Sequence, residues 1–211
     1  MRRALIGLAV TTLTVLALAG PASAAPGQVT QLRFHGTFAE AFWFTSSATS
    51  STDTSVNVSK SRQGSELFVD QFTANYDANG NFTGATDTSA DVTSGFSFAI
   101  QPSLASASLS ASGLPATTCT FDANFNLIGC SPTTIDVTAT WTGHGPISRA
   151  VFNDHFKSDG FSENDHFNGT DRAATATGTI GGLTLSTSEL QFADLGTANS
   201  GTITVCIGTS C

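Results

Sequence analysis

Apolar and polar residues alternate along most of this chain. In the segment 37–45, Phe38, Phe42 and Phe44 fall on one face when every second residue is taken. A period of two is typical of a strand with one buried and one solvated face. The alternation predicts strands at 29–35, 37–45, 66–76, 104–111, 133–142, 147–156, 161–168, 172–180 and 201–207.

The segment 45–65 interrupts this regular pattern. It consists largely of Ser and Thr, and only Val56 and Val58 alternate in an apolar sense. Such a composition predicts either a long polar turn around a weak strand or a mobile loop.

The composition supports the same fold class. Charged residues make up only 11% of the chain, whereas 32 Thr and 25 Ser supply hydroxyls and 16 Phe supply apolar bulk. Thr and Phe suit a pleated, half-buried surface, and turn signals recur at about the 8–12-residue spacing of all-β folds. We therefore predict an all-β protein, an antiparallel β-sandwich or flattened barrel built from hairpins, with one domain at 25–211.

The N-terminus has the features of a secretory signal peptide. Arg2 and Arg3 precede an apolar run over 4–19 and small residues up to Ala24, which predicts cleavage of residues 1–24 and export of the remainder. Residues 25–211 hold six basic and sixteen acidic residues, a balance that disfavours nucleic-acid binding. No second apolar run reaches 18 residues, so no transmembrane segment is predicted.

One segment of the chain is repeated. Residues 76–93 and 121–138 align without a gap at an offset of 45, and nine of their eighteen positions are identical. The repeat indicates either a duplicated hairpin or two hairpins that share their turn chemistry. In the first copy Asn79-Gly80 is a strong signal for a two-residue type I′ turn.

A turn centred on Asn79-Gly80 places Ala74 opposite Ala85. The same register in the second copy places Cys119 opposite Cys130, although Phe125 replaces the turn glycine and suggests a wider turn there. Directly opposed residues lie close enough for a disulfide.

An even number of cysteines in an exported chain indicates disulfides. The four cysteines permit three pairings, and the register favours Cys119–Cys130. Cys206 and Cys211 then pair by elimination.

A second short motif recurs after eleven residues. Asn-Asp-His-Phe occupies 153–156 and again 164–167, with Asp159-Gly160 between the copies. If Asp159-Gly160 forms a two-residue turn, Asn153 faces His166 and His155 faces Asn164.

In that register Asp154 faces Asp165, with Glu163 on the same face. Like charges placed opposite each other are unfavourable, and a calcium ion would relieve the conflict. The alternative is a solvated face on which water screens the carboxylates. His144, His155 and His166 are also eleven residues apart. Imidazoles bind transition metals, but this spacing alone does not bring the three rings together.

The chain contains no nucleophile motif of the G-x-S-x-G type. Trp43 and Trp141 suit either a platform for stacking sugars or the protein core.

The segment 141–146 (Trp-Thr-Gly-His-Gly-Pro), together with Phe156, Gly160-Phe161, 166–170 and 172–178, resembles a group of uncharacterised, exported, β-rich bacterial proteins, chiefly actinobacterial. The likeness covers about half of the predicted mature chain. It implies secretion and a β-rich fold, and supplies no activity, substrate or catalytic residue. It points to Trp141, His166 and Arg172 as binding candidates, each of which also suits a structural role.

These observations favour a secreted, monomeric, non-enzymatic protein of the extracellular space or cell surface. Its hydroxyl, amide and aromatic groups suit a glycan or cell-envelope polymer. A secreted hydrolase with a site assembled from scattered acids and histidines is the first alternative. A structural component of the cell envelope is the second. An exposed row of aromatic rings would favour binding, whereas a cleft with two carboxylates of raised pKa would favour hydrolysis.

Overall fold

The computed structural model describes residues 28–62, 64–158 and 161–207, in which the regular elements are strands. They are β1 (Gln28–Ser46), β2 (Ser50–Ser61), β3 (Ser65–Tyr76), β4 (Phe82–Val92), β5 (Phe96–Ile100), β6 (Ser106–Phe121), β7 (Leu127–Gly143), β8 (Ser148–Ser158), β9 (Phe161–Ile180), β10 (Leu183–Leu185) and β11 (Leu190–Ile207). The predicted all-β class is confirmed. Within these ranges, no helix offers the length and apolar character needed to cross a membrane.

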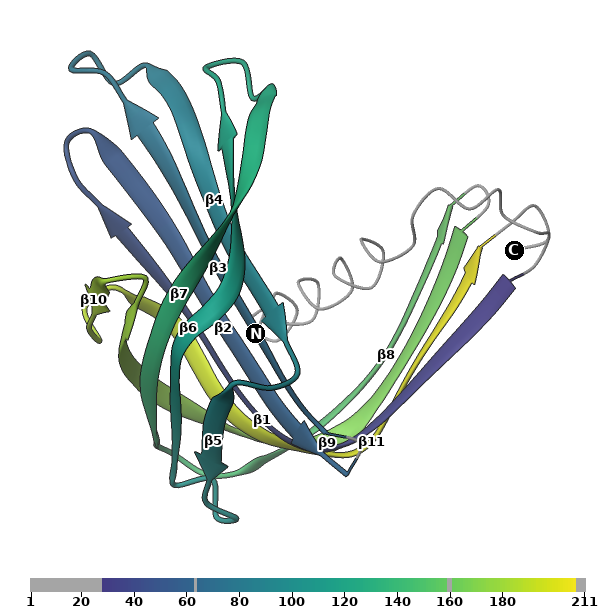
Figure 1. Cartoon of the computed structure of the whole chain (residues 1–211). Helices are drawn as coiled ribbons and strands as arrows, with labels where there is room; N and C mark the ends of the chain where they lie inside the picture. The colour runs from purple at the N-terminus through teal and green to yellow at the C-terminus, as the bar shows by residue number, and fades with distance from the viewer. Residues whose placement is uncertain (1–27, 63, 159–160, 208–211) are drawn as a thin grey trace. The chain divides into compact units, whose positions relative to one another are not determined.

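All eleven strands belong to one antiparallel sheet, and its hydrogen bonding closes into a ring. The strand order is β10-β9-β11-β1-β2-β3-β4-β6-β5, and β7 bonds to both β6 and β9. Figure 1 shows β2, β3 and β4 as neighbouring strands of this sheet. A closed sheet is the second of the two predicted arrangements.

The chain forms two compact units. The larger unit comprises residues 34–151 and 168–200. The described part of the smaller unit consists of residues 28–33, 152–158, 161–167 and 201–207. Strands β1, β8, β9 and β11 therefore contribute residues to both units.

One face of the sheet in the larger unit forms the hydrophobic core, and we call it the inner face. On β1 and β2 the inward residues pair directly, as Ala39 with Val58 and Ala41 with Val56. The largest fully buried side chains are Trp43, Trp141, Leu67, Leu104, Leu114, Ile180, Leu185, Leu195, Val56, Val58, Val69 and Val137. The inner face is thus filled by side chains from strands around the ring.

A bulge on β6 keeps its apolar residues on the inner face. Before the bulge Leu109 is buried, whereas after it Leu114 and Ala116 are buried, so the inward positions change from odd to even. The register shifts between Ala111 and Leu114, and Gly113 has a φ of 63°. An extra residue of this kind bends a strand while preserving the contacts on either side.

The polar segment 45–65 forms the regular strand β2 over most of its length, whereas the prediction was a weak strand within a long polar turn, or a mobile loop. β2 pairs with β1 and with β3 along nearly its whole length. Val56 and Val58 are buried, and Thr52 shares a hydroxyl hydrogen bond of 3.0 Å with Thr73 of β3. Pairing on both sides, together with two inward valines, holds this segment in the sheet despite its Ser/Thr composition.

Two predicted pairs of strands are continuous in the structure. Segments 29–35 and 37–45 both lie in β1, and segments 161–168 and 172–180 both lie in β9. The last strand begins at Leu190 rather than at 201.

The repeated hairpins have the predicted register but a different turn. Ala74 lies opposite Ala85, as expected, yet the backbone N–H of Asp77 donates to the carbonyl of Asn81 at 2.9 Å. A type I′ turn requires a positive φ at both central residues. Of Asn79 and Gly80 only Gly80 has one, so the prediction of a two-residue type I′ turn is wrong. A register shift beside the turn restores the predicted pairing.

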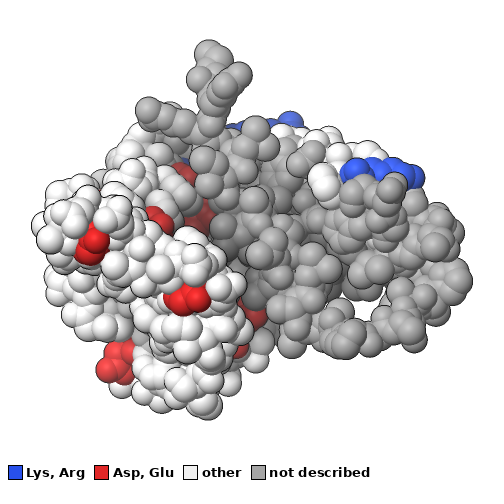
Figure 2. Space-filling model, turned by 90° about the horizontal axis from the view of Figure 1, so that it is seen from above, with Lys and Arg blue, Asp and Glu red and all other residues white. Residues whose placement is uncertain are grey.

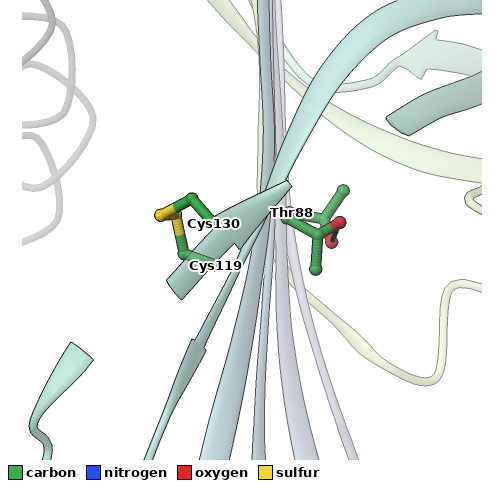
Figure 3. The surroundings of a disulfide bond; sticks show 4 residues. Thr88, Cys119 and Cys130 are labelled. Atoms are coloured by element: carbon green, nitrogen blue, oxygen red, sulfur yellow. Dashed lines mark hydrogen bonds between the residues drawn. A yellow bond between two sulfur atoms is a disulfide. The ribbon is translucent and has the colours of Figure 1, made fainter. Parts of the chain in front are cut away.

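The second copy confirms the predicted disulfide between Cys119 and Cys130. The two residues are directly opposed on β6 and β7. Figure 3 shows the disulfide on one side of the strands and the inward-facing Thr88 on the other. The disulfide therefore lies on the outer face, where it joins the two strands next to their turn.

Candidate functional site

Four aromatic rings form a row at the end of the sheet that carries the two repeated turns. We call Tyr76, Phe82, Phe125 and Phe72 the aromatic row. Phe82 lies edge-on to Tyr76 at a centroid distance of 6.2 Å and stacks on Phe125 at 4.5 Å. Phe125 also stacks on Phe72 at 6.4 Å. The row thus joins the first hairpin to the turn of the second.

Phe125 is held in a backbone conformation that disfavours its side chain. Its φ is 61°, whereas the equivalent residue of the first turn is Gly80, with a φ of 81°. For a residue with a side chain, the left-handed region costs about 1–2 kcal/mol. Even so, 59% of the Phe125 surface is exposed. Backbone outliers of this kind are frequent at ligand-binding sites, so Phe125 is a candidate site residue.

The exposed apolar surface continues from Phe125 into β7. Leu127 and Ile128 are exposed by 58% and 68%, more than most apolar residues of the chain. The Cys119–Cys130 disulfide crosslinks the strands directly behind these residues. The disulfide therefore holds together the two strands that flank this apolar turn.

Each turn beside the row contains a hydrogen-bonded aspartate. Asp77 Oδ1 accepts the backbone N–H groups of Asn79 and Asn81, at 2.8 and 2.9 Å, and Oδ2 accepts the Asn81 amide at 2.9 Å. Asp122 makes the same three bonds with Asn124 and Asn126. The bonds from Asn81 and from Asn126, respectively, are the main reason that the pKa of each carboxyl is lowered. Both aspartates are consequently ionised at neutral pH.

A pair of acids lies on the outer face beside Phe72. Asp87 of β4 is directly opposite Phe72, and Asp70 of β3 is two residues from it on the same face. Burial raises the pKa of Asp70 to about 7, assisted by the charge of Asp87 and a hydrogen bond with it, and by the charge of Asp53. Asp87 Oδ1 is one of two buried side-chain oxygens without a hydrogen-bond partner in the described ranges.

A second pair of acids, Glu40 and Asp194, lies on the neighbouring strands β1 and β11. Burial and then the charge of Asp194 raise the pKa of Glu40 to about 7. The pKa of Asp194 is raised to about 6 by burial and by Asp171, and His144 opposes this shift. Carboxyl groups that titrate near neutral pH are able to transfer protons. Sequence reasoning missed both pairs because the partners come from different strands.

A shallow groove lies apart from these acids, on β5, β6 and β7. Its lining residues are Gly95, Phe96, Ser97, Ser110, Ala111, Ser112 and Thr138. These residues contribute hydroxyl and apolar groups and no ionisable group. One of them, Ser112, donates a hydrogen bond of 2.9 Å to the carboxylate of Asp136.

Trp141 is part of the core rather than of the surface. It is 1% exposed, and its indole N–H donates to the carbonyl of Glu40 at 2.9 Å. Trp43 is fully buried, and its indole N–H donates to the carbonyl of Ala176. Of the two alternatives predicted for these tryptophans, a sugar-stacking platform or the core, the structure shows the core.

Arg172 holds a loop in place. Its guanidinium donates to the carbonyl oxygens of Gly145 and Ser103, both at 3.2 Å, and to that of Leu104 at 3.5 Å. Leu104 is buried and has a φ of 53°. These bonds attach a strained loop to β9.

His166 belongs to the β8–β9 hairpin of the smaller unit. His166 Nδ1 is hydrogen-bonded to the Asn153 side chain, and His155 Nδ1 to that of Asn164 at 2.7 Å. These two pairs are the ones predicted from an Asp159-Gly160 turn, although residues 159–160 themselves lie outside the described residues. His166 thus lies in the smaller unit, whereas Trp141 and Arg172 lie in the larger unit.

The calcium candidates remain a prediction. The side chains of Asp154, Glu163 and Asp165 lie outside the described part of the structure. Among the residues that are described, no three His, Cys, Asp or Glu side chains are grouped so that they could hold a metal ion. Cys206 is disulfide-bonded, and its predicted partner, Cys211, lies beyond the described ranges.

The chain matches no protein-family model, and comparison with curated proteins and with solved structures found no match.

Proposed function

We propose that the protein is a secreted, non-enzymatic binding protein that holds an extracellular glycan or cell-envelope polymer on the aromatic row. The strained and exposed Phe125 carries this proposal. In the same turn geometry the first hairpin has Gly80, which adopts a positive φ at little cost. A contact with a ligand explains why a phenylalanine occupies the corresponding position in the second hairpin.

Because side chains fill the core, we place the proposed binding site on the outer surface. Trp43 and Val58 are fully buried, and Trp141 is 1% exposed, so large side chains occupy the interior of the ring. Aromatic rings on the outer face, by contrast, offer apolar surface at which the C–H groups of a sugar can pack. The crosslinked turn limits the motion that binding would have to restrict.

The proposal is tested by exchanging the second turn residue for that of the first. Phe125→Gly removes the ring and also releases the backbone strain. The loss of stacking, about 0.5–1.5 kcal/mol, is similar in size to the strain relieved. We therefore expect the free energy of unfolding to change by less than about 1 kcal/mol, while binding is lost.

The measurement is the fraction of protein pelleted with cellulose, chitin, chitosan, xylan or bacterial cell wall. Phe44→Ala is a matched control because Phe44 is 41% exposed on β1, outside the aromatic row. The wild type and Phe44→Ala should pellet with at least one polymer, and Phe125→Gly should not. Equal retention of Phe125→Gly and wild type, or no retention on any polymer, would refute the proposal.

A secreted hydrolase is the second candidate, and the two acid pairs favour it. In Asp70 and Glu40 the chain has two carboxyl groups with a pKa of about 7, the range suited to a general acid or base. The test is release of reducing sugar from the same polymers by the wild type, Asp70→Asn and Glu40→Gln. Activity that disappears in one of these variants would establish hydrolysis, and no activity in the wild type would exclude it for these substrates.

A further inference from the structure

We infer that the ligand of the aromatic row is a cationic polymer, namely a glycan that carries free amino groups. This inference rests on the proposed function and adds the chemical class of the ligand. It is drawn from the distribution of charge around the row and from the chemistry of the two turns.

The strands that carry the row contain no positive charge. Residues 63–143 hold seven acidic residues and no Lys, Arg or His, although the whole chain has eight Lys and Arg and four His. This segment includes β3, β4, β6 and β7, which bear the row and its disulfide. On the face seen in Figure 2, separate groups of acidic side chains lie within a mainly uncharged described surface, and Lys and Arg side chains appear elsewhere on that face.

Two of these charges are fixed next to the row. Asp77 directly follows Tyr76, and Asp122 begins the turn that ends beside Phe125. Three hydrogen bonds hold each carboxylate in position. A carboxylate accepts about four such bonds, so each retains capacity for a further donor. An ammonium group is the donor that best matches a fixed carboxylate.

The rings and the carboxylates suit the same ligand. A protonated amine is attracted by the face of an aromatic ring and by a neighbouring carboxylate. The ring of an amino sugar brings apolar C–H groups and an ammonium group within a few ångströms of each other. Anionic polymers would be repelled by Asp77 and Asp122, and a neutral polymer would gain hydroxyl hydrogen bonds from them without the attraction between opposite charges.

Chitosan and chitin provide matched probes because they share a sugar backbone and differ in whether the amino group is free or acetylated. The experiment measures pelleting of the full protein at mildly acidic pH with chitin and with crosslinked chitosan beads, which remain insoluble when their amines are protonated. Under these conditions the amines of chitosan are largely protonated, and the lowered pKa values of Asp77 and Asp122 keep both ionised. Salt is varied from about 0.05 to 0.5 M, because exposed charges are screened over this range.

The test variant is Asp77→Asn with Asp122→Asn. Asparagine removes the charge and keeps an oxygen for the two backbone N–H groups, but its amide nitrogen cannot accept the third bond, which comes from the side chain of Asn81 or Asn126. The control is Asp136→Asn. Asp136 is exposed, whereas Asp77 and Asp122 are half-buried. It accepts two hydrogen bonds, from Ser112 Oγ at 2.9 Å and from Gly113 N at 2.7 Å, and it lies away from the row. Thermal unfolding confirms that each variant is folded.

The wild type should bind chitosan more strongly than chitin, and added salt should weaken this binding. The double variant should lose affinity for chitosan by about tenfold or more, whereas Asp136→Asn should stay within about twofold of the wild type.

Equal retention on chitin and chitosan, or retention only on another neutral polymer, would overturn the inference and leave the proposed function standing. An equal loss in Asp136→Asn would overturn it as well, since attraction would then reflect net charge alone. No retention on any polymer would refute the proposed function itself.

Discussion

Replacing Glu40 by glutamine should stabilise the protein at neutral pH and leave it unchanged in acid. Glu40 lies on the outer face of β1, two residues from Phe38 and from Phe42, and opposite Asn57 of β2. Burial and the charge of Asp194 raise its pKa from 4.5 to about 7. The folded state therefore disfavours the ionised carboxylate.

The size of this effect follows from the difference in pKa between the two states. Below about pH 4.5 the carboxyl is protonated in the folded and the unfolded chain, so it does not affect stability. Between about pH 4.5 and 7 the unfolded chain ionises first, and the free energy of unfolding falls as the pH rises. Above about pH 7 the loss is complete, at about 3 kcal/mol. Glutamine has a similar shape and stays neutral, so Glu40→Gln should recover most of this free energy at pH 8.

Urea unfolding measures the difference, and the fluorescence of the buried Trp43 and Trp141 reports the transition. Wild type and Glu40→Gln are compared at about pH 4, 6 and 8, with Asp91→Asn as a control because Asp91 is exposed on β4. The control should change stability by less than about 0.5 kcal/mol at each pH. A Glu40→Gln variant no more stable than wild type at pH 8, or equally stabilised at pH 4, would refute the reasoning.

Two further substitutions test other parts of the structure. Thr54 is fully buried and its hydroxyl is one of the two buried oxygens without a partner, so Thr54→Val should raise the free energy of unfolding by about 1–2 kcal/mol in the same urea assay. A destabilised Thr54→Val would show that the hydroxyl is bonded. Arg172→Met should lower the free energy of unfolding by about 2 kcal/mol, because the loop around Leu104 loses its charged hydrogen bonds. Arg172→Lys should recover part of that loss, and an unchanged melting temperature in Arg172→Met would contradict the assigned role.

The sequence was most informative where structure depends on neighbouring residues. The register of the second hairpin, and with it the Cys119–Cys130 disulfide, could be predicted because alternation and turn residues are local signals. The turn type could not be predicted from Asn79-Gly80 alone, because the Asp77 side chain organises the turn by accepting three hydrogen bonds.

The elements that depend on distant partners were harder to predict. β2 is held by pairing on both sides, which its Ser/Thr composition does not reveal. The charges of Glu40 and Asp194 interact because β1 and β11 are neighbours in the closed sheet, although 153 residues lie between them in the chain. For Phe125, the sequence did contain a signal, since the repeat shows a phenylalanine in place of Gly80. That difference suggested a wider turn, whereas the structure shows the same turn with a strained residue.

Closure of the ring also determines the order in which the protein can fold. β1 and β11 are neighbours in the sheet but lie at opposite ends of the described chain, so their pairing requires nearly the whole polypeptide. Non-local pairing of this kind is slow, because the entropy of closing a long loop opposes it. Until β11 is available, β1 has an open edge that could pair with another molecule. The hairpin of β2 and β3 can form early, whereas the finished ring can appear only after the last strand has been synthesised.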